Sequence, residues 1–200
     1  MSNVLTANVS VQGTRPLLWH RFGPDAIPLE KRERAGVAGN DPTEWRRTVL
    51  YTPEGQLYLE PTYIFGCLCN AAKYTKTGRG SIQTLVKATL MVVDNRILID
   101  RFIPNFNGGL PADIPTDPTL PVYLDIRMVR NPQTKGANVR YRVAASQGWK
   151  ASFSITWDRT VVDRGQMEAV MIDAGKLIGL GDGRSIGLGR FAVEIFDVVG

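Results

Sequence analysis

Alternation of polar and apolar residues predicts β-strands at both ends of the chain. Val4–Gln12 alternates over its whole length, with Leu5, Ala7, Val9 and Val11 as its apolar positions. This period of two is the pattern of a half-buried strand. Lys150–Asp158 repeats it, and Phe191–Val199 predicts a closing strand. We therefore expect both ends of the chain to form β-strands.

Two other segments follow the helical period of about 3.6 residues. The first starts at Pro61 or Thr62 and runs to about Thr75, with Ile64 and Leu68 on one apolar face. The second starts at Asp163, where Gln166 stands three positions later as a capping box requires. Its apolar positions continue to Ile178. Each segment predicts one amphipathic helix.

The middle of the chain predicts further strands and one long loop. Val122–Arg130 and Asn138–Ala145 predict a β-hairpin, and 103–121 is a proline- and glycine-rich loop that is too long for a simple connector. Shorter strands are predicted at four places: Thr48–Tyr51, Gln56–Glu60, Leu85–Val93 and Arg96–Asp100. A short helix is predicted after Asp41, because proline and glutamate follow it at capping spacing.

The order of these elements predicts an α+β fold. A strand–helix–strand unit occurs around 57–93 and again around 150–199. Two such halves indicate the ferredoxin-like (RRM-like) βαββαβ core, in which two helices cover one face of the sheet. We expect a single domain over 1–200, interrupted by an insertion at 21–46 and by a protruding hairpin at 122–145. Two hundred residues are an ordinary size for one domain.

Composition excludes several classes of protein. No apolar run is long enough for a membrane span, and the N-terminus lacks the pattern of a secretion signal. Cys67 and Cys69 predict reduced thiols in a cytoplasmic protein. His20 is the only histidine, which argues against a histidine-rich metal site. We expect no metal and no cofactor.

Positive charge is segregated along the sequence. The formal net charge is +5, yet two segments carry lysine and arginine without any acid. One runs from Pro61 to Val93 and holds Lys73, Lys76, Arg79 and Lys87; the other runs from Ile126 to Trp157 and holds Arg127, Arg130, Lys135, Arg140, Arg142 and Lys150. Such segregation is typical of a site for a polyanion. A solvated basic surface without a partner is the alternative.

The segment Gly179–Gly189 carries five glycines between the last helix and the last strand. A dinucleotide-binding loop has the opposite order, strand before helix, and no phosphate-loop lysine follows here. The glycines therefore indicate a loop whose backbone can approach a ligand closely. A helix C-cap followed by a tight turn is the simpler alternative.

Two motifs resemble the repeat-associated mysterious protein (RAMP) superfamily, the RNA-binding subunits of CRISPR effector complexes and related guide-RNA endonucleases. One is Leu177–Phe191, a helix end, glycine-rich loop and strand, and the other is Leu57–Ala72, a strand and proline followed by a helix with an internal glycine. The second motif lacks the Ser-Ser-Leu-Lys run usual in the family. The start Pro16–His20 and the glycine string also resemble a group of uncharacterised phage proteins.

The resemblance implies a place for RNA. The loop positions Gly181, Gly183, Arg184, Gly187 and Gly189 would line an RNA backbone, and 122–145 would act as a protruding finger that grips RNA and a neighbouring subunit. Together with the charge pattern, this predicts nucleic-acid-binding residues at Lys73, Lys76, Arg79, Arg127, Arg130, Lys135, Arg140, Arg142, Gly181, Gly183, Arg184, Gly187, Gly189 and Arg190.

The leading hypothesis is a non-catalytic protein that binds single-stranded RNA or DNA by its backbone, without reading sequence. The resemblance implies assembly as a homo-oligomer or among effector-complex subunits. A second hypothesis is a metal-independent endoribonuclease that uses His20 as its general acid or base, for which the sequence offers no organised partner. A third is a phage structural or interaction protein that binds another protein through 21–46 or 103–121.

Overall fold

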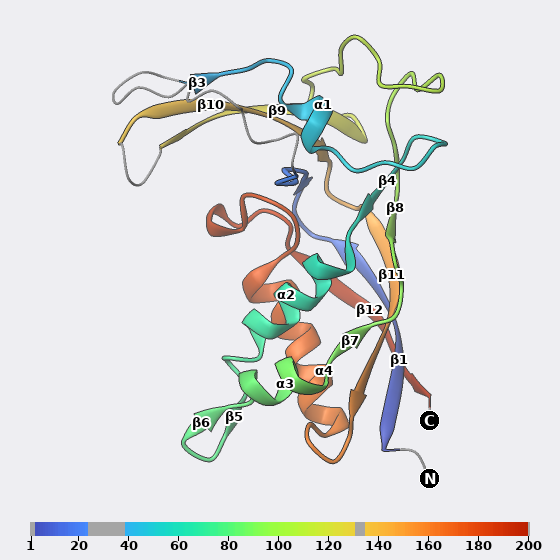
Figure 1. Cartoon of the computed structure of the whole chain (residues 1–200), viewed down its shortest axis with the longest axis vertical. Helices are drawn as coiled ribbons and strands as arrows, with labels where there is room; N and C mark the ends of the chain where they lie inside the picture. The colour runs from blue at the N-terminus through green and yellow to red at the C-terminus, as the bar shows by residue number, and fades with distance from the viewer. Residues whose placement is uncertain (1–2, 24–38, 131–134, 200) are drawn as a thin grey trace. The chain divides into compact units, whose positions relative to one another are not determined.

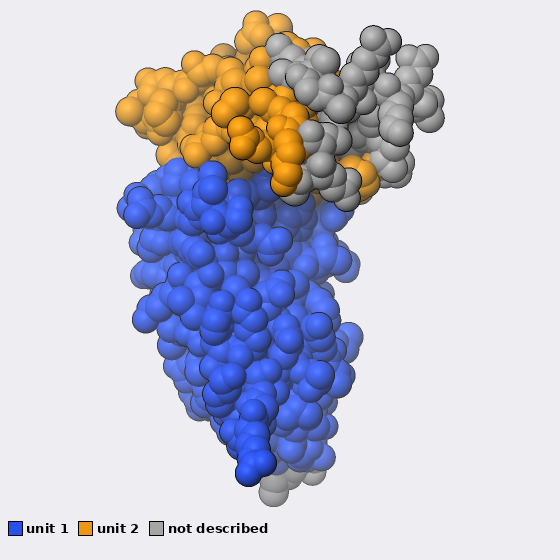
Figure 2. Space-filling model, turned by 90° about the vertical axis from the view of Figure 1, so that its left-hand side faces the viewer, with its two compact units in different colours: residues 1–17, 58–100, 147–200 blue, residues 18–57, 101–146 orange. Residues whose placement is uncertain are grey.

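The computed structural model describes residues 3–23, 39–130 and 135–199. The chain divides into two compact units (Figure 2). Unit 1 comprises residues 1–17, 58–100 and 147–200, and unit 2 comprises residues 18–57 and 101–146. The segments expected to interrupt the domain, 21–46 and 122–145, both fall within unit 2, although 24–38 and 131–134 lie outside the described residues.

Unit 1 is built on the larger sheet (Figure 1). Its described strands follow the order β12-β1-β11-β8-β4, and β7 pairs with β11. The bounds are β1 Val4–Gly13, β4 Gln56–Leu59, β7 Met91–Val92, β8 Ile97–Phe102, β11 Lys150–Asp158 and β12 Phe191–Val199. β1 is antiparallel to both of its neighbours, β11 and β12. The fold is therefore α+β with antiparallel pairing.

Three helices lie against one face of this sheet (Figure 1): α2 Pro61–Ala71, α3 Gln83–Thr89 and α4 Arg164–Asp173. A turn of π-helix, Ala174–Ile178, extends α4. The apolar positions of β1 are buried, and so are Ile64, Leu68 and Val170 of the helices. Burial of this apolar surface stabilises unit 1. The capping box predicted at Asp163 and Gln166 is confirmed.

Where β1 meets β11, the opposite face of the sheet is polar. Ser10 and Ser152 hydrogen-bond across β1 and β11 at 2.8 Å, and the Ser154 hydroxyl lies 3.1 Å from the Asn8 side-chain oxygen. An RRM-type sheet binds bases by stacking them on aromatic side chains. These hydroxyl and amide groups offer no such platform.

Unit 2 contains the predicted hairpin, now β9 Val122–Arg130 and β10 Ala137–Ala145. The described strands of the smaller sheet follow the order β2-β10-β3, and β9 pairs with β10. β2 is Leu17–Leu18 and β3 is Gly39–Asn40. The residues 103–121 form no helix or strand, as expected for a long loop.

The strands at both ends, the hairpin and the long helices are confirmed. The prediction of a strand at Leu85–Val93 is wrong for its first half, because α3 occupies it, and right only at β7, Met91–Val92. Ile82, Val86 and Leu90 are all buried, and their spacing of four residues puts them on one helical face. The strand predicted at Thr48–Tyr51 is also absent from the described residues. Thr48 ends α1 Trp45–Thr48, and only Tyr51 forms a bridge, to Leu57.

Candidate nucleic-acid interface

The glycine-rich loop closes on itself. All five glycines have a positive φ, between 68° and 84°, a conformation that favours glycine. The Leu180 amide donates to the Gly189 carbonyl at 2.9 Å, and the Gly189 amide donates to the Pro16 carbonyl at 2.8 Å. A Cβ on Gly189 would lie 1.8 Å from the Leu180 oxygen. Gly189 is therefore required for loop closure.

The accessible part of the loop is its tip. Arg184–Ile186 forms one turn of 3-10 helix, and all three of its residues are exposed. A Cβ on Gly187 would meet no atom within 4 Å, so the backbone there borders open space. Gly181 and Gly189 are buried, while Gly183 and Arg190 are half-buried. A ligand backbone could therefore reach Arg184, Ser185 and Gly187 first.

A second basic segment lies elsewhere in unit 1. Lys73, Lys76 and Arg79 are exposed around a small hairpin of β5 Lys76–Thr77 and β6 Gly80–Ser81. The Lys73 ammonium lies 4.8 Å from the centre of the Tyr74 ring. Figure 1 shows this hairpin beyond the C-terminal end of α2, at the opposite end of the helical layer from the glycine-rich loop. The two predicted sites in unit 1 are therefore separate.

The basic hairpin of unit 2 has two different faces. The register pairs Arg140 with Arg127 and Arg142 with Asp125, so these side chains share one face. The opposite face carries Ile126, Met128, Arg130, Val139 and Tyr141. Ile126 and Met128 are exposed there. Lys135, in the turn, is also exposed.

Carboxylates already engage three of the arginines. Arg127 Nε donates to both oxygens of Asp125, at 2.8 and 3.0 Å. The buried Arg142 lies 3.5 Å from the same carboxylate. Arg140 donates to Glu44 at 2.6 Å. Much of the positive charge on this face is therefore neutralised inside unit 2, and Arg142 is not accessible to a ligand.

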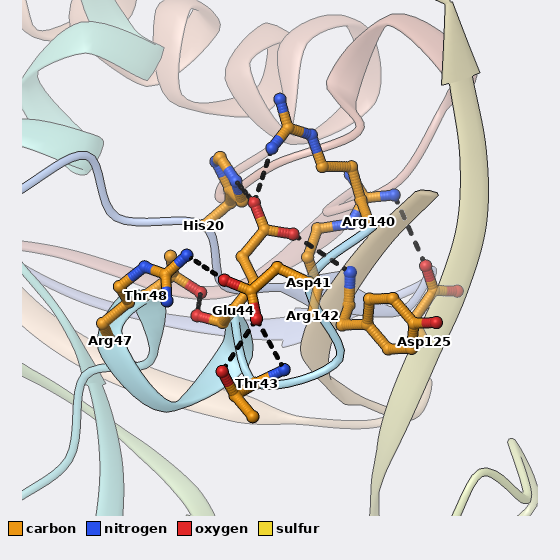
Figure 3. Close-up of polar contacts among 10 residues, drawn as sticks. His20, Asp41, Thr43, Glu44, Arg47, Thr48, Asp125, Arg140 and Arg142 are labelled. Atoms are coloured by element: carbon orange, nitrogen blue, oxygen red, sulfur yellow. Dashed lines mark hydrogen bonds and ion pairs between the residues drawn. The ribbon is translucent and has the colours of Figure 1, made fainter. Parts of the chain in front are cut away.

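Glu44 is the centre of this arrangement (Figure 3). Its Oε1 lies 3.1 Å from His20 Nε2, and its Oε2 accepts a hydrogen bond from the Tyr141 amide at 3.2 Å. Burial raises the pKa of Glu44, but the hydrogen bonds from His20 and the Tyr141 amide and the nearby Arg140 outweigh it and lower the pKa below its ordinary value. Glu44 is therefore a buried carboxylate held in its charged form.

Sequence reasoning missed the roles of Glu44 and Asp125. The acid-free segment began at Ile126, one residue after Asp125. Asp125 and Arg127 are two positions apart on a strand and so share a face, which was a usable signal. Glu44 lies 96 positions before Arg140. No local pattern reports such a contact.

His20 now has an organised partner, because Glu44 contacts its Nε2. The histidine side chain is 23% exposed, so solvent or a ligand can reach part of the ring. The carboxylate could orient the ring and leave Nδ1 for proton exchange. The same contact could equally fix the segment after β2 to the start of α1.

No group of three or more histidine, cysteine or acidic side chains that could hold a metal ion occurs among the described residues. Cys67 is buried, and burial raises the pKa of its thiol to about 12. Its Sγ lies 3.6 Å from the Ala174 carbonyl. At neutral pH the thiol is protonated, so it is a packing group rather than a metal ligand.

Comparison with known proteins gives a structural likeness but no family. No family model matches the chain, and no curated protein matches it in sequence. Among solved structures, the fold matches a chain in the cryo-EM structure of the Type III-B Cmr-beta bound to cognate target RNA, with a TM-score of 0.57 and 12% identity. The match covers 98% of this chain and 61% of the other.

At this level of identity the likeness establishes the fold alone. The protein has the α+β fold of a chain found in a Type III-B Cmr structure, and it spans about three-fifths of that chain's length. Among the described residues, no helix is long and apolar enough to cross a membrane.

Proposed function

We propose that this protein is a RAMP-type subunit that binds single-stranded nucleic acid, RNA in the first place. It would contact the sugar–phosphate backbone of the strand. The observation that carries the proposal is the fold match over nearly the whole chain to a protein in a structure bound to target RNA. In the larger sheet, β12, β1, β11 and β7 are neighbours in that order. Along the chain, α2 comes between β1 and β7, and α4 comes between β11 and β12. This order supports a ferredoxin-like core. Assembly with further subunits in the cytoplasm belongs to the same proposal.

The exposed cations are the groups best placed to contact phosphates. Among the predicted nucleic-acid-binding residues, six cations are exposed: Lys73, Lys76, Arg79, Arg130, Lys135 and Arg184. Arg127 and Arg140 remain 41% and 35% exposed beside their carboxylates and can contribute secondarily. Arg142 contributes to the hairpin rather than to a ligand, since it is buried against Asp125. Contacts of this kind position a strand without reading its sequence.

Gly183 and Gly187 contribute in a different way. The Gly187 amide already donates to the Arg184 carbonyl within the turn, so these glycines contribute by lacking side chains that would block the approach of a phosphate backbone. Gly189 and Arg190 support this site indirectly through backbone hydrogen bonds that close the loop, and Gly181 is buried within it. The proposed contact is therefore the loop tip.

Binding of the nuclease-treated protein to labelled single-stranded RNA, single-stranded DNA and duplex DNA, at low and high salt, tests the proposal. We expect salt-sensitive binding that favours single strands and leaves them intact. Arg184→Glu should weaken it several-fold, whereas the control Arg159→Glu, an exposed arginine away from the loop tip, should not. Equal binding by both variants would remove the loop from the interface. No binding to any strand at low salt would favour a protein partner instead.

The His20–Glu44 contact supports a second candidate function, metal-independent cleavage of RNA. In this mechanism Glu44 would orient the ring, and His20 would exchange the proton of an attacking 2′-hydroxyl. RNA shortened in the presence of EDTA by the wild type, but not by His20→Ala, would establish it. Intact RNA with both proteins would leave the contact as a structural one.

A further inference from the structure

A shallow depression of about 320 Å³ lies beside β9 in unit 2. Residues 123–127 of the strand line one side of it, and Thr116 and Pro118 of the long loop line the other. All of these residues belong to the same compact unit. The volume is at the lower end of the roughly 300–1,000 Å³ that is typical of small-ligand sites. The depression can therefore hold a small ligand.

Arg127 supplies a guanidinium group that is only partly engaged. Its Nε donates to both oxygens of Asp125, at 2.8 and 3.0 Å, whereas neither of its Nη atoms forms a hydrogen bond with a described residue. The side chain is 41% exposed. The contact with Asp125 holds the group in place, and the two Nη atoms can donate to a ligand in the fork geometry that suits phosphate.

Tyr123 supplies a second donor. Its side chain shares a face of β9 with that of Arg127, because the two residues are four positions apart on a strand. Tyr123 is only 4% exposed, yet its hydroxyl forms no hydrogen bond with any described residue. Burial and the nearby Asp125 carboxylate raise the pKa of Tyr123, so the hydroxyl stays protonated at neutral pH. Leaving such a buried donor unpaired is costly, and a ligand oxygen in the depression would satisfy it.

The Ile126 amide also faces the depression. Ile126 pairs with Tyr141 of β10, and the Tyr141 amide donates away from β9, to Glu44 at 3.2 Å. Directly opposite residues of an antiparallel pair direct their backbone groups either toward each other or both away. The Ile126 N–H therefore points away from β10, as does that of Leu124, which donates to the Pro115 carbonyl at 2.7 Å. Since Ile126 lines the depression, its N–H is a further donor there.

The loop side adds a hydroxyl and no carboxylate. Thr116 is exposed, and its hydroxyl forms no hydrogen bond with a described residue. The neighbouring Asp117 does not line the depression. Its carboxylate accepts from the Thr119 amide and hydroxyl instead, at 2.9 and 2.7 Å.

The charge around the depression favours an anion. Asp125 lies between two guanidinium groups, those of Arg127 and Arg142, so one positive charge is in excess. Figure 3 shows the Arg142 side of this arrangement. Arg140, which pairs with Arg127 across the hairpin, is balanced by Glu44. Hydrogen-bond donors beside an excess positive charge are the features that recognise an oxyanion.

We propose that this depression binds a phosphate group. The proposed ligands are the Nη atoms of Arg127, the hydroxyls of Tyr123 and Thr116, and the amide of Ile126. The phosphate could be free, could belong to a mononucleotide or could belong to a nucleic-acid strand, because the same donors recognise all three. Only the last of these sources rests on the proposed function.

Equilibrium dialysis at low salt, with labelled inorganic phosphate and labelled adenosine 5′-monophosphate, tests the site. We expect saturable binding of both, and none of adenosine, which lacks the phosphate. Tyr123→Phe removes only the hydroxyl and should weaken binding about tenfold, as for one lost hydrogen bond to a charged group. The control Tyr141→Phe, on the other face of the same hairpin, should bind like the wild type. No saturable binding by the wild type, or equal binding by the two variants, would overturn the proposal.

Arg127→Lys tests the fork, because it keeps the positive charge and removes the planar pair of donors. We expect it to lose most of the phosphate binding, whereas Arg159→Lys, an exposed arginine in unit 1, should retain it. Urea unfolding shows whether the change at the Asp125 contact affects the fold. If it does, Tyr123→Phe decides the proposal. Full phosphate binding by a folded Arg127→Lys would overturn it.

Competition identifies the source of the phosphate and separates this inference from the proposed function. If the site takes its phosphate from a strand, saturating adenosine 5′-monophosphate should weaken the binding of labelled single-stranded RNA that carries no terminal phosphate, and so should Tyr123→Phe. Unchanged RNA binding, with mononucleotide binding that depends on Tyr123, would support a site for free phosphates. Phosphate binding without any strand binding would overturn the proposed function alone. Strand binding without phosphate or mononucleotide binding would overturn this site alone.

Discussion

At the scale of single residues, buried carboxylates organise the basic hairpin. Glu44 joins three groups that are far apart in sequence: His20, Arg140 and the Tyr141 amide. Asp125 does the same for Arg127 and Arg142. A buried charge is tolerated only where partners compensate its lost hydration. These arginines therefore serve the fold before they serve any ligand.

Replacing Glu44 tests this role. Glu44→Gln should cost about 1–3 kcal/mol of unfolding free energy at neutral pH, because charged hydrogen bonds are lost around a buried group. The lowered pKa makes this contribution fully present above the ordinary value of 4.5 and lost as the pH falls through the folded-state value. Urea unfolding at neutral and acidic pH measures both effects. A pH dependence in the Gln variant as steep as that of the wild type would contradict this assignment.

Two glycines of the loop should differ in how well they tolerate replacement by alanine. Gly189→Ala should destabilise unit 1 strongly, since the new Cβ would collide with the Leu180 oxygen at a φ of +68°. Gly187→Ala adds only the backbone penalty of about 1–2 kcal/mol, because its surroundings are open. Thermal unfolding of the two variants should separate them clearly. Similar losses would mean that φ alone explains both glycines.

At the scale of elements, we expect the small hairpin of β5 and β6 to contact nucleic acid separately from the glycine-rich loop. It lies away from the glycine-rich loop within unit 1, so one short strand of nucleic acid cannot reach both. A longer strand can span them, which makes affinity depend on length. Fluorescence anisotropy with oligonucleotides of increasing length measures this dependence.

Lys76→Glu with Arg79→Glu should therefore flatten the length dependence and leave the binding of the shortest strands by the loop unchanged. The matched control is Arg159→Glu with Arg164→Glu, two exposed arginines that lie outside the proposed interface. A uniform loss of affinity at every length would instead place all the cations in one site.

At the scale of the whole molecule, we expect the six exposed cations of the proposed interface to set the salt dependence of binding. If all six contact phosphates, the slope of log K against log salt should be about −4 for a single strand. A slope near −1 would mean that most of these groups are solvated and unbound. Titrations at several salt concentrations with the wild type and Arg184→Glu give the slope directly, and the variant should lower its magnitude by about 0.7.

Local patterns determined much of this protein. Period-two alternation located β1, β11 and the two hairpin strands, and the capping box located the start of α4, because such signals depend on residues close in sequence. The same reasoning misread α3. The spacing of Ile82, Val86 and Leu90 fits a helix, but the apolar residues among them suggested a strand.

Only the tertiary structure decided which basic residues are accessible. Composition counts Arg127, Arg140 and Arg142 as positive charge, while the folded chain brings Asp125 and Glu44 against them. It also separates the two basic segments of unit 1. Charge can be read from a sequence because it belongs to each residue, whereas exposure and pairing depend on contacts between residues that are distant along the chain.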